Sequence, residues 1–238
     1  SYAMLTMGAS HLIETFGSEE QKQRFLQPML DGRFFGTMAL TEPHAGSSLS
    51  DLRTLTRKAK GCQACPLWRP ATQTVFGQGP EDAVAMLIGE QPGNREDLDG
   101  APFVGPAGQL LDRALADAGL DRKTLYLTNT VKHFKFEQRG KARLHQRPDA
   151  GHVRACLDWL QREIGTVRPE LIVCLGATAA AAVFGAGFSL TGQRGAWHTL
   201  GNGVRAMATV HPAWVLRQPA AARAAAYRGL VGDLRTAG

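Results

Sequence analysis

Residues 84–93 read VAMLIGEQPG, a short apolar run that ends in a tight polar turn. The run Val84–Ile88 has no polar residue, which is typical of a strand buried on both faces of a sheet. The turn contains glycine and proline, residues that end strands and let other groups approach the backbone closely. The same pattern of an apolar run closed by turn residues recurs at Leu125–Thr128, Leu171–Leu175 and Val204–Val210.

Helical stretches surround these runs. They are expected over Asp51–Ala59, Gln109–Ala118, Gly151–Ile164, Ala177–Phe184 and Ala220–Leu234. Strands that alternate with helices indicate a parallel sheet covered on both faces. We therefore predict a three-layer α/β/α fold with a four-stranded parallel sheet. Ligand sites in such sheets form at the carboxyl ends of the strands.

Chemically useful side chains stand at these strand ends. They are Glu90 and Gln91 after the first run, with Gly89 and Gly93 in the same turn, Asn129 after the second run and His211 after the fourth. An amide offers a donor and an acceptor side by side, and an imidazole can donate a hydrogen bond to a developing anion. An asparagine at a strand end or a His-Pro pair can also be an ordinary turn. Phe103 offers an aromatic face, although a core phenylalanine is the commoner explanation.

The stretch Lys132–Pro148 concentrates positive charge next to a strand end. Phe134 and Phe136 interleave with basic residues that only Glu137 opposes: Lys132, Lys135, Arg139, Lys141, Arg143 and Arg147. Basic and aromatic residues together suit a surface that follows a nucleic-acid backbone and stacks on bases. A solvated loop is the alternative.

The cysteines are Cys62, Cys65, Cys156 and Cys174. The first two form a C-x2-C pair, which in a reducing compartment more often binds a metal or performs redox chemistry than forms a structural disulfide. The sequence has no second close pair of the kind found in zinc ribbons. Spacing alone leaves open an iron–sulfur cluster, a zinc site, or buried cysteines that act as small hydrophobic residues.

Length, composition and charge limit the classes of protein to which this chain can belong. The chain has 238 residues, 44% of them apolar, enough for one sizeable core with a small appendage. No apolar run approaches the roughly 20 residues of a membrane span, and we see no secretory signal, so we expect a cytoplasmic protein. The net charge of +6 divides into −2 for residues 1–50 and +8 for the remainder. The basic remainder favours a polyanionic partner.

Residues 1–50 indicate a short helical appendage. We expect a helix over Gln21–Leu30, with Ser18 as a cap near its start, and a strand over Phe35–Leu40. Residues 16–54, FGSEEQKQRFLQPMLDGRFFGTMALTEPHAGSSLSDLRT, resemble the middle of an acyl-CoA dehydrogenase, in which TEPHAGS belongs to the flavin-contacting domain. The other walls of a flavin pocket lie outside the resemblance, so we expect a fragment without a working flavin site.

The second segment, residues 51–238, resembles the uracil-DNA glycosylase superfamily in its iron–sulfur branch. The resemblance rests on GEQPG (89–93), GAPFVGPAGQLLDRAL (100–115), TNTVKHFKF (128–136), LIVCLGATAA (171–180) and HPAWVLR (211–217). Gln91, where ordinary members usually carry alanine, and the loop GKARLHQRP (140–148) are similar to the covalently trapping UdgX-type group. The resemblance implies that the four cysteines hold a [4Fe–4S] cluster, which would be structural.

The resemblance also implies how a flipped-out uracil would be bound. Phe103 would stack on the base, Asn129 would read its edge, and His211 would aid its departure. The backbone at Gly89 and Gly93 would approach the sugar or the base. The partner would be uracil-containing DNA, with single strands preferred; no protein partner can be inferred.

Covalent capture is the more specific implication. His145 would attack the anomeric carbon of the sugar and stay bonded to it, so that each molecule acts once. Glu90 and Gln91 would line the reaction centre. The DNA contacts predicted are Lys132, Lys135, Lys141, Arg143, Arg147 and Arg217.

The sequence departs from the trapping group at a few positions. Ala142 replaces a usual basic residue and Leu144 a usual isoleucine, which is expected to weaken DNA binding. Asn94 occupies a usually acidic position, which is expected to alter the polar network around Glu90. The alternatives are a conventional multiple-turnover glycosylase with His145 as a bystander, a DNA-binding protein without catalysis, and, from residues 1–50 alone, a flavoenzyme.

Overall fold

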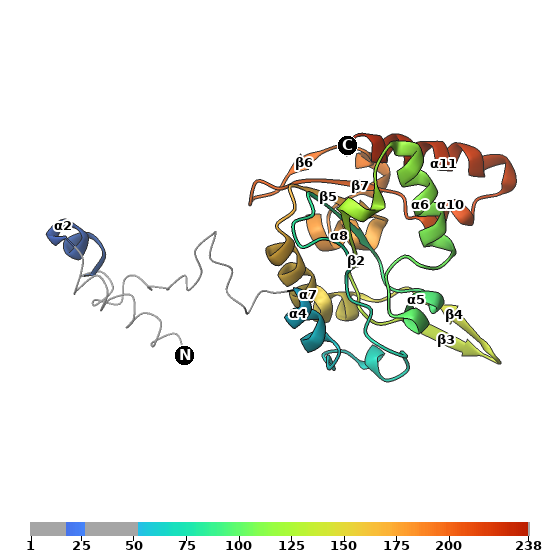
Figure 1. Cartoon of the computed structure of the whole chain (residues 1–238), viewed down its shortest axis with the longest axis horizontal. Helices are drawn as coiled ribbons and strands as arrows, with labels where there is room; N and C mark the ends of the chain where they lie inside the picture. Colours follow the sequence, from blue (N-terminus) through green and yellow to red (C-terminus); the bar gives the residue numbers. More distant parts are fainter. Residues whose placement is uncertain (1–17, 27–51, 238) are drawn as a thin grey trace. The chain divides into compact units, whose positions relative to one another are not determined.

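The computed structural model describes residues 18–26 and 52–237 of the chain (Figure 1). The chain divides into two units, Ser1–Ser47 and Ser48–Gly238, and each is described by itself. Within the described residues, the structure contains no helix of the length and apolar character that crossing a membrane requires.

The first unit contributes one short helical segment. Helix α2 covers Glu19–Gln21 and is followed by a π-helical turn, η1, over Lys22–Leu26. Lys22 and Glu19 form an ion pair of 3.0 Å on its surface. The segment overlaps the helix predicted over Gln21–Leu30 in part, while the strand predicted over Phe35–Leu40 lies outside the described residues.

The second unit is built on a mostly parallel sheet. Its strands are β1 Ala85–Gly89, β2 Leu125–Asn129, β5 Leu171–Leu175, β6 His198–Thr199 and β7 Arg205–Thr209. Among the described residues they are ordered β2-β1-β5-β7-β6. The first four are parallel, and β6 is an antiparallel edge strand beside β7. The four-stranded prediction is corrected by β6, which is too short to form a recognisable apolar run.

Helices lie on both faces of this sheet (Figure 1). They are α4 Leu52–Ala59, η2 Pro66–Trp68, α5 Asn94–Asp99, α6 Pro106–Ala118, η3 Arg122–Thr124, α7 Ala150–Val167, α8 Ala177–Phe184, α9 Leu190–Gln193, α10 Pro212–Leu216 and α11 Ala220–Arg235. Successive strand side chains point to opposite faces. Leu87 and Val173 therefore pack against α6 and α11, whereas Ile88 and Ile172 pack against α7 and α8.

The ends of these elements lie close to those predicted. Strand β5 and helix α8 have the predicted bounds. Strand β2 is one residue longer than predicted, and β1 and β7 differ by one residue at each end. Helix α6 begins at Pro106, earlier than predicted, because proline lacks only an N–H that the first helical turn leaves unpaired anyway. The parallel register aligns Gly89 with Asn129, so the carboxyl ends of β1 and β2 meet.

A two-stranded hairpin replaces the basic loop predicted over Lys132–Pro148. Strand β3 covers Phe136–Arg139 and pairs antiparallel with β4, Ala142–His145. The register places Phe136 opposite His145 at the base of the hairpin. Gly140, at φ 57°, supplies the left-handed residue that a tight hairpin turn requires.

Candidate active site

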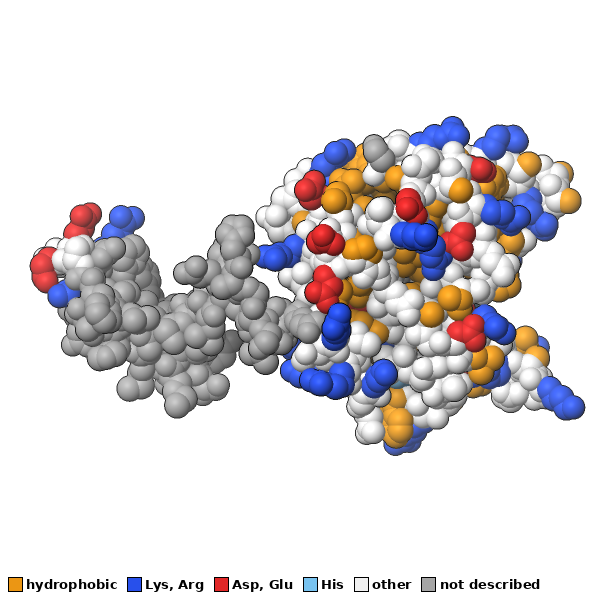
Figure 2. Space-filling model, viewed as in Figure 1, with side chains coloured by type: hydrophobic (Ala, Val, Ile, Leu, Met, Phe, Trp, Pro, Cys, Tyr) orange, Lys and Arg blue, Asp and Glu red, His pale blue; other side chains and the backbone are white. Residues whose placement is uncertain are grey.

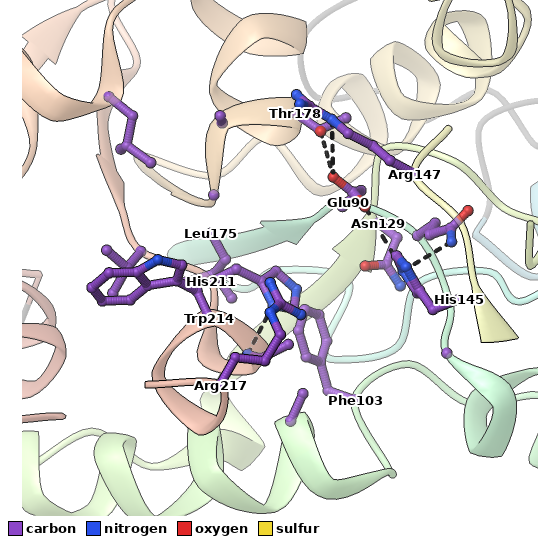
Figure 3. A pocket seen from close by; sticks show the side chains of 18 of the residues that line it. Glu90, Phe103, Asn129, His145, Arg147, Leu175, Thr178, His211, Trp214 and Arg217 are labelled. Carbon is purple, nitrogen blue, oxygen red and sulfur yellow. Dashed lines mark hydrogen bonds and ion pairs between the residues drawn. The ribbon is translucent and has the colours of Figure 1, made fainter. Parts of the chain in front are cut away.

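A cavity of about 1050 Å³ lies at the carboxyl ends of β1, β2, β5 and β7. It brings together most of the predicted site residues, which come from the strand ends, α10 and the hairpin (Figure 3). Those that line it are Glu90, Gln91, Gly93, Phe103, Asn129, His145, Arg147, His211 and Arg217. The cavity therefore joins residues that stand far apart in the sequence.

Gly89 lets two of these side chains reach the cavity wall. A Cβ atom at this position would lie 2.3 Å from Oδ1 of Asn129 and 2.7 Å from Cζ of Phe103. Both distances are shorter than atoms tolerate without moving. Gly89 does not line the cavity itself, so its role in the structure is to make room for Asn129 and Phe103. Gly93 lines the cavity and donates its N–H to Glu96 Oε2 at 3.1 Å, at the start of α5.

Phe103 is held in an unusual backbone conformation. Its φ is 55°, in the left-handed region that bulky residues rarely adopt. Gly108 packs against it so closely that a Cβ there would lie 1.8 Å from the carbonyl oxygen of Phe103. The ring stacks on that of His211, with centroids 6.2 Å apart and an interplanar angle of 27°. Tight packing thus fixes an aromatic face in the cavity wall.

His211 is neutral, and its hydrogen bond determines which ring nitrogen carries the proton. Its Nδ1 accepts a hydrogen bond from the Ala213 N–H at 3.1 Å, at the start of α10. Burial, together with the charges of Arg217 and His145, lowers the pKa of the imidazole to about 4. The proton of the neutral ring therefore lies on Nε2, which can donate a hydrogen bond.

Glu90 has three polar neighbours in the cavity (Figure 3). The hydroxyl of Thr178 donates to its Oε2, and Nε of Arg147 lies 3.8 Å from the same oxygen. Its other oxygen, Oε1, lies 3.8 Å from Nε2 of His145. Thr178 was not predicted. The signal for it was its place directly after β5, in the stretch LIVCLGATAA at the same sheet edge.

Gln91 connects the sheet to the hairpin through a fixed amide. Its Oε1 accepts the N–H of Lys135 at 3.1 Å, and its Nε2 donates to the carbonyls of Lys135 and Gln146 at 3.2 and 3.0 Å. These backbone groups determine which end of the amide is nitrogen. The same Nε2 lies 2.9 Å from Nε2 of His145, so its two hydrogens are shared among this nitrogen and the two carbonyls. Because an amide NH₂ can only donate, the His145 nitrogen presents a lone pair.

The surroundings of His145 favour its neutral form. Burial lowers the pKa of the imidazole below its ordinary value, Glu90 opposes this, and Arg217 reinforces it. The side chain is still 48% exposed, so a ligand in the cavity can reach it. The ring therefore offers an unprotonated, accessible nitrogen next to a carboxylate.

Arg143 anchors the hairpin, while its predicted DNA contact stays a prediction. Its guanidinium pairs with the fully buried Asp97 at 2.6 Å and donates to Asn94 Oδ1 at 2.6 Å. It also covers the rings of Phe134 and Phe136, at 5.5 and 5.0 Å. With its donors occupied, Arg143 fastens β4 to α5. Asn94 accordingly binds the hairpin and not the network around Glu90.

Lys132 is a correction among the predicted DNA contacts. Its side chain is 1% exposed and forms an ion pair with Glu163, which is 0% exposed. Its ammonium group also donates to the carbonyl of Asn129 at 2.6 Å and to Thr128 Oγ1 at 2.8 Å. A buried lysine with these partners cannot reach DNA. It holds the end of β2 against α7 instead.

The other predicted DNA contacts lie at the surface. Lys135 pairs with Asp149 at 3.3 Å, and Lys141 is exposed in the hairpin turn. Arg147 and Arg217 are exposed at the cavity. Lysine and arginine side chains are scattered over the visible face of this unit (Figure 2). DNA contact at these four residues stays a prediction.

Comparison with known proteins identifies the family. The sequence model of the uracil DNA glycosylase superfamily matches residues 76–235. The chain belongs to this superfamily. The type-4 uracil-DNA glycosylase of Archaeoglobus fulgidus is 36% identical over 179 residues, which are 72% of this chain and 86% of the relative. That of Pyrobaculum aerophilum is 35% identical over 181 residues, 71% and 87% of the two chains.

This uracil DNA glycosylase superfamily member also has a short similarity of another kind. The 3-methylmercaptopropionyl-CoA dehydrogenase of Ruegeria pomeroyi is 48% identical over 50 residues, which are 21% of this chain. They are only 8% of that dehydrogenase. The similarity therefore leaves nearly all of that protein unmatched.

Three of the four cysteines of this superfamily member lie together. Cys65 and Cys156 share a small hydrophobic cluster, and the thiols of Cys65 and Cys62 both influence the pKa of Cys156, which burial raises to about 11. Cys174 lies in β5 and packs in the separate cluster between the sheet and α7 and α8. The structure therefore places Cys174 apart from the other three cysteines of the predicted ligand set. No group of three or more His, Cys, Asp or Glu side chains in the described residues converges as around a single ion.

Proposed function

We propose that this protein removes uracil from DNA and is captured on the resulting sugar through Nε2 of His145. The observation that carries the proposal is the hydrogen bond from the Gln91 amide to that nitrogen, 2.9 Å long. It holds an imidazole lone pair in the same cavity as an aromatic face, an amide and a neutral donor imidazole. An unprotonated nitrogen is what a nucleophile needs, and a general base is not required to prepare it.

Uracil recognition follows from the cavity wall. The base enters flipped out of the stack, lies against the ring of Phe103 and pairs its edge with the amide of Asn129. As the glycosidic bond breaks, its electron pair leaves with uracil. The neutral His211 donates its Nε2 proton in a hydrogen bond to the oxygen that gains negative charge. A neutral donor suits this role because its low pKa leaves no positive charge to be desolvated beforehand.

The sugar is left as an oxocarbenium-like cation. The carboxylate of Glu90 stabilises this charge, and Thr178 and Arg147 orient the carboxylate. The hydrogen bond from Gln91 to His145 Nε2 then breaks, and the released lone pair forms the bond to the anomeric carbon. Its high effective concentration lets it outcompete water. The alkylated ring is an imidazolium until Nδ1 releases its proton to water.

A denaturing gel tests capture directly. Uracil-containing single-stranded DNA is incubated with the protein, and a slower band that resists heat and detergent should appear in proportion to the protein added. His145→Ser should remove the band while uracil release continues, because His211, Phe103 and Asn129 remain. His152→Ser, a histidine outside the cavity, is the matched control and should keep the band.

Two results would reject covalent capture. One is free abasic DNA without a shifted band from the unchanged protein, which would leave a conventional multiple-turnover glycosylase. The other is a band that persists in His145→Ser. We further propose that single strands are the preferred DNA, since an unpaired base avoids part of the unstacking cost. Parallel assays on matched double-stranded DNA test this preference.

We also propose that Cys62, Cys65 and Cys156 hold a [4Fe–4S] cluster. Cys65 and Cys156 are buried beside Leu67 and Val131, and the half-buried Cys62 lies near them. Such a group of thiols suits a bulky cluster, whose ligands stand farther apart than those of one ion. A bound cluster supplies a structural link between the chain after α4 and the helix α7. Iron and acid-labile sulfide in protein purified without oxygen test its presence.

A further inference from the structure

His133 is a buried side chain with one unexplained nitrogen. It is 4% exposed, and its Nδ1 meets no hydrogen-bond partner among the described residues. A buried polar atom without a partner is costly, so such atoms usually mark a bound water, an ion or a functional site. None of the catalytic steps proposed above uses this residue.

The neighbours of the other ring nitrogen determine where the proton lies. Oγ1 of Thr74 is 2.9 Å from His133 Nε2 and 3.0 Å from the carbonyl oxygen of Ala59. The carbonyl can only accept, so the single hydroxyl proton of Thr74 goes to it. The hydroxyl oxygen then accepts from Nε2–H of His133. The ring is therefore neutral with a bare lone pair on Nδ1.

This arrangement is typical of a metal-bound histidine. Such a ring donates its second N–H to a hydroxyl, carboxylate or carbonyl, which fixes the tautomer and aims the free lone pair at the metal. Thr74 fills this position for His133.

His133 also lies in the neighbourhood of the three clustered thiols. The carbonyl of Ala59 that binds Thr74 also accepts the backbone N–H of Cys62, at 3.0 Å. On the other side, the backbone of Lys132, the residue before His133, forms a hydrogen bond with the Cys156 thiol. Hydrogen bonds therefore connect His133 to Cys62 through Thr74 and Ala59. The neighbouring residue, Lys132, connects it to Cys156.

Cys174 does not compete for the same place. Its side chain packs among apolar residues of the sheet and α8. Desolvation alone shifts its pKa upward, with no contribution from another thiol.

From these contacts we infer that Nδ1 of His133 is the fourth protein ligand of the iron–sulfur cluster, beside Cys62, Cys65 and Cys156. This inference rests on the proposed cluster. It assigns a Cys₃His set in which the histidine replaces the cysteine expected from sequence.

Spectroscopy of the whole chain tests the ligand. In anaerobically purified and reduced protein, pulsed electron paramagnetic resonance should detect a strongly coupled ligand ¹⁴N nucleus. His133→Cys should keep iron and sulfide near the wild-type content and lose the ¹⁴N coupling. It should also lower the reduction potential, because replacing histidine by thiolate ligands lowers cluster potentials. His133→Ala should lose iron.

Cys174→Ala is the matched control and should leave the iron content, the ¹⁴N coupling and the potential unchanged. A wild-type cluster without ligand ¹⁴N coupling, or loss of iron in Cys174→Ala, would overturn the assignment of His133 while leaving the cluster in place. Wild-type protein that takes up no iron or sulfide would instead overturn the cluster and this assignment together. Uracil release by such iron-free protein would leave the proposed glycosylase function standing.

Discussion

His145 acts as a nucleophile only while its imidazole is neutral, so its pKa determines the pH range in which capture occurs. The group is half-exposed, and burial and Arg217 hold its pKa below the ordinary 6.5, against the pull of Glu90. A group with a lowered pKa remains neutral at neutral pH and gains its proton only as the pH falls through that lower value.

We therefore predict that capture fails in acid before uracil release does. The fraction of product that is crosslinked should be constant at neutral pH and fall with a midpoint below 6.5. Gel quantification of crosslinked and abasic products across this range measures it. A midpoint above the ordinary imidazole value would contradict a lowered pKa for His145. His211 does not impose the same limit, since its pKa is about 4.

A substitution at Gly89 tests how the cavity wall is packed. Gly89→Ala should push Asn129 and Phe103 from the cavity wall, because the new Cβ meets both. We expect about 1–3 kcal/mol of lost stability from overpacking and a fall in uracil release of about 100-fold from misplacement. Single-turnover kinetics and urea unfolding measure the two effects. Gly201→Ala, where a Cβ meets no atom within 4 Å, is the control and should be active.

Among the elements, the β3–β4 hairpin depends most on the rest of the fold. An isolated two-stranded hairpin is only marginally stable in water. Here Gln91 ties it to the end of β1, and Arg143 ties it to α5. The position of His145 at its base is therefore set by contacts outside the hairpin.

Arg143→Ala should consequently separate capture from excision. Loss of the contact with Asp97 frees the hairpin, so the crosslinked fraction should fall about tenfold while uracil release persists. Lys141→Ala removes an exposed charge from the hairpin turn and should leave the crosslinked fraction unchanged. Equal loss of uracil release and of crosslinking in Arg143→Ala would argue against this separate role of the hairpin.

The same hairpin shows what sequence patterns could not reveal. The parallel strands were predictable because continuous apolar runs ended in turn residues. The hairpin strands are mostly charged and exposed, and their stabilising contacts lie far away in sequence. In the sequence, Lys132 could not be distinguished from its exposed basic neighbours. Its burial depends on an ion pair with Glu163, which lies far away in the sequence on α7. The choice between Cys174 and His133 likewise depends on the direction of a side chain, which spacing does not encode.

At the scale of the whole molecule, every residue of the cavity and of the described hydrophobic clusters belongs to Ser48–Gly238. The superfamily match begins at residue 76. The second unit thus contains the machinery proposed for excision and capture.

Deletion of Ser1–Ser47 should leave the thermal unfolding midpoint, the iron content and uracil release of the remaining chain unchanged. Calorimetry, iron analysis and the gel assay measure these properties side by side with the full chain. A clear drop in the midpoint or in activity would mean that the first unit supports the second. Loss of flavin-like absorbance on deletion would revive the flavoenzyme alternative for residues 1–50.

The amide of Gln91 performs two tasks with one group of atoms. It fastens the hairpin to the sheet, and it faces His145 with hydrogens that exclude a proton from Nε2. A swing of the hairpin away from the sheet would break both relations at once. The position and the protonation state of His145 therefore depend on the same contact. If the imidazole moved out of the cavity, it would also lose the neighbour that keeps Nε2 unprotonated.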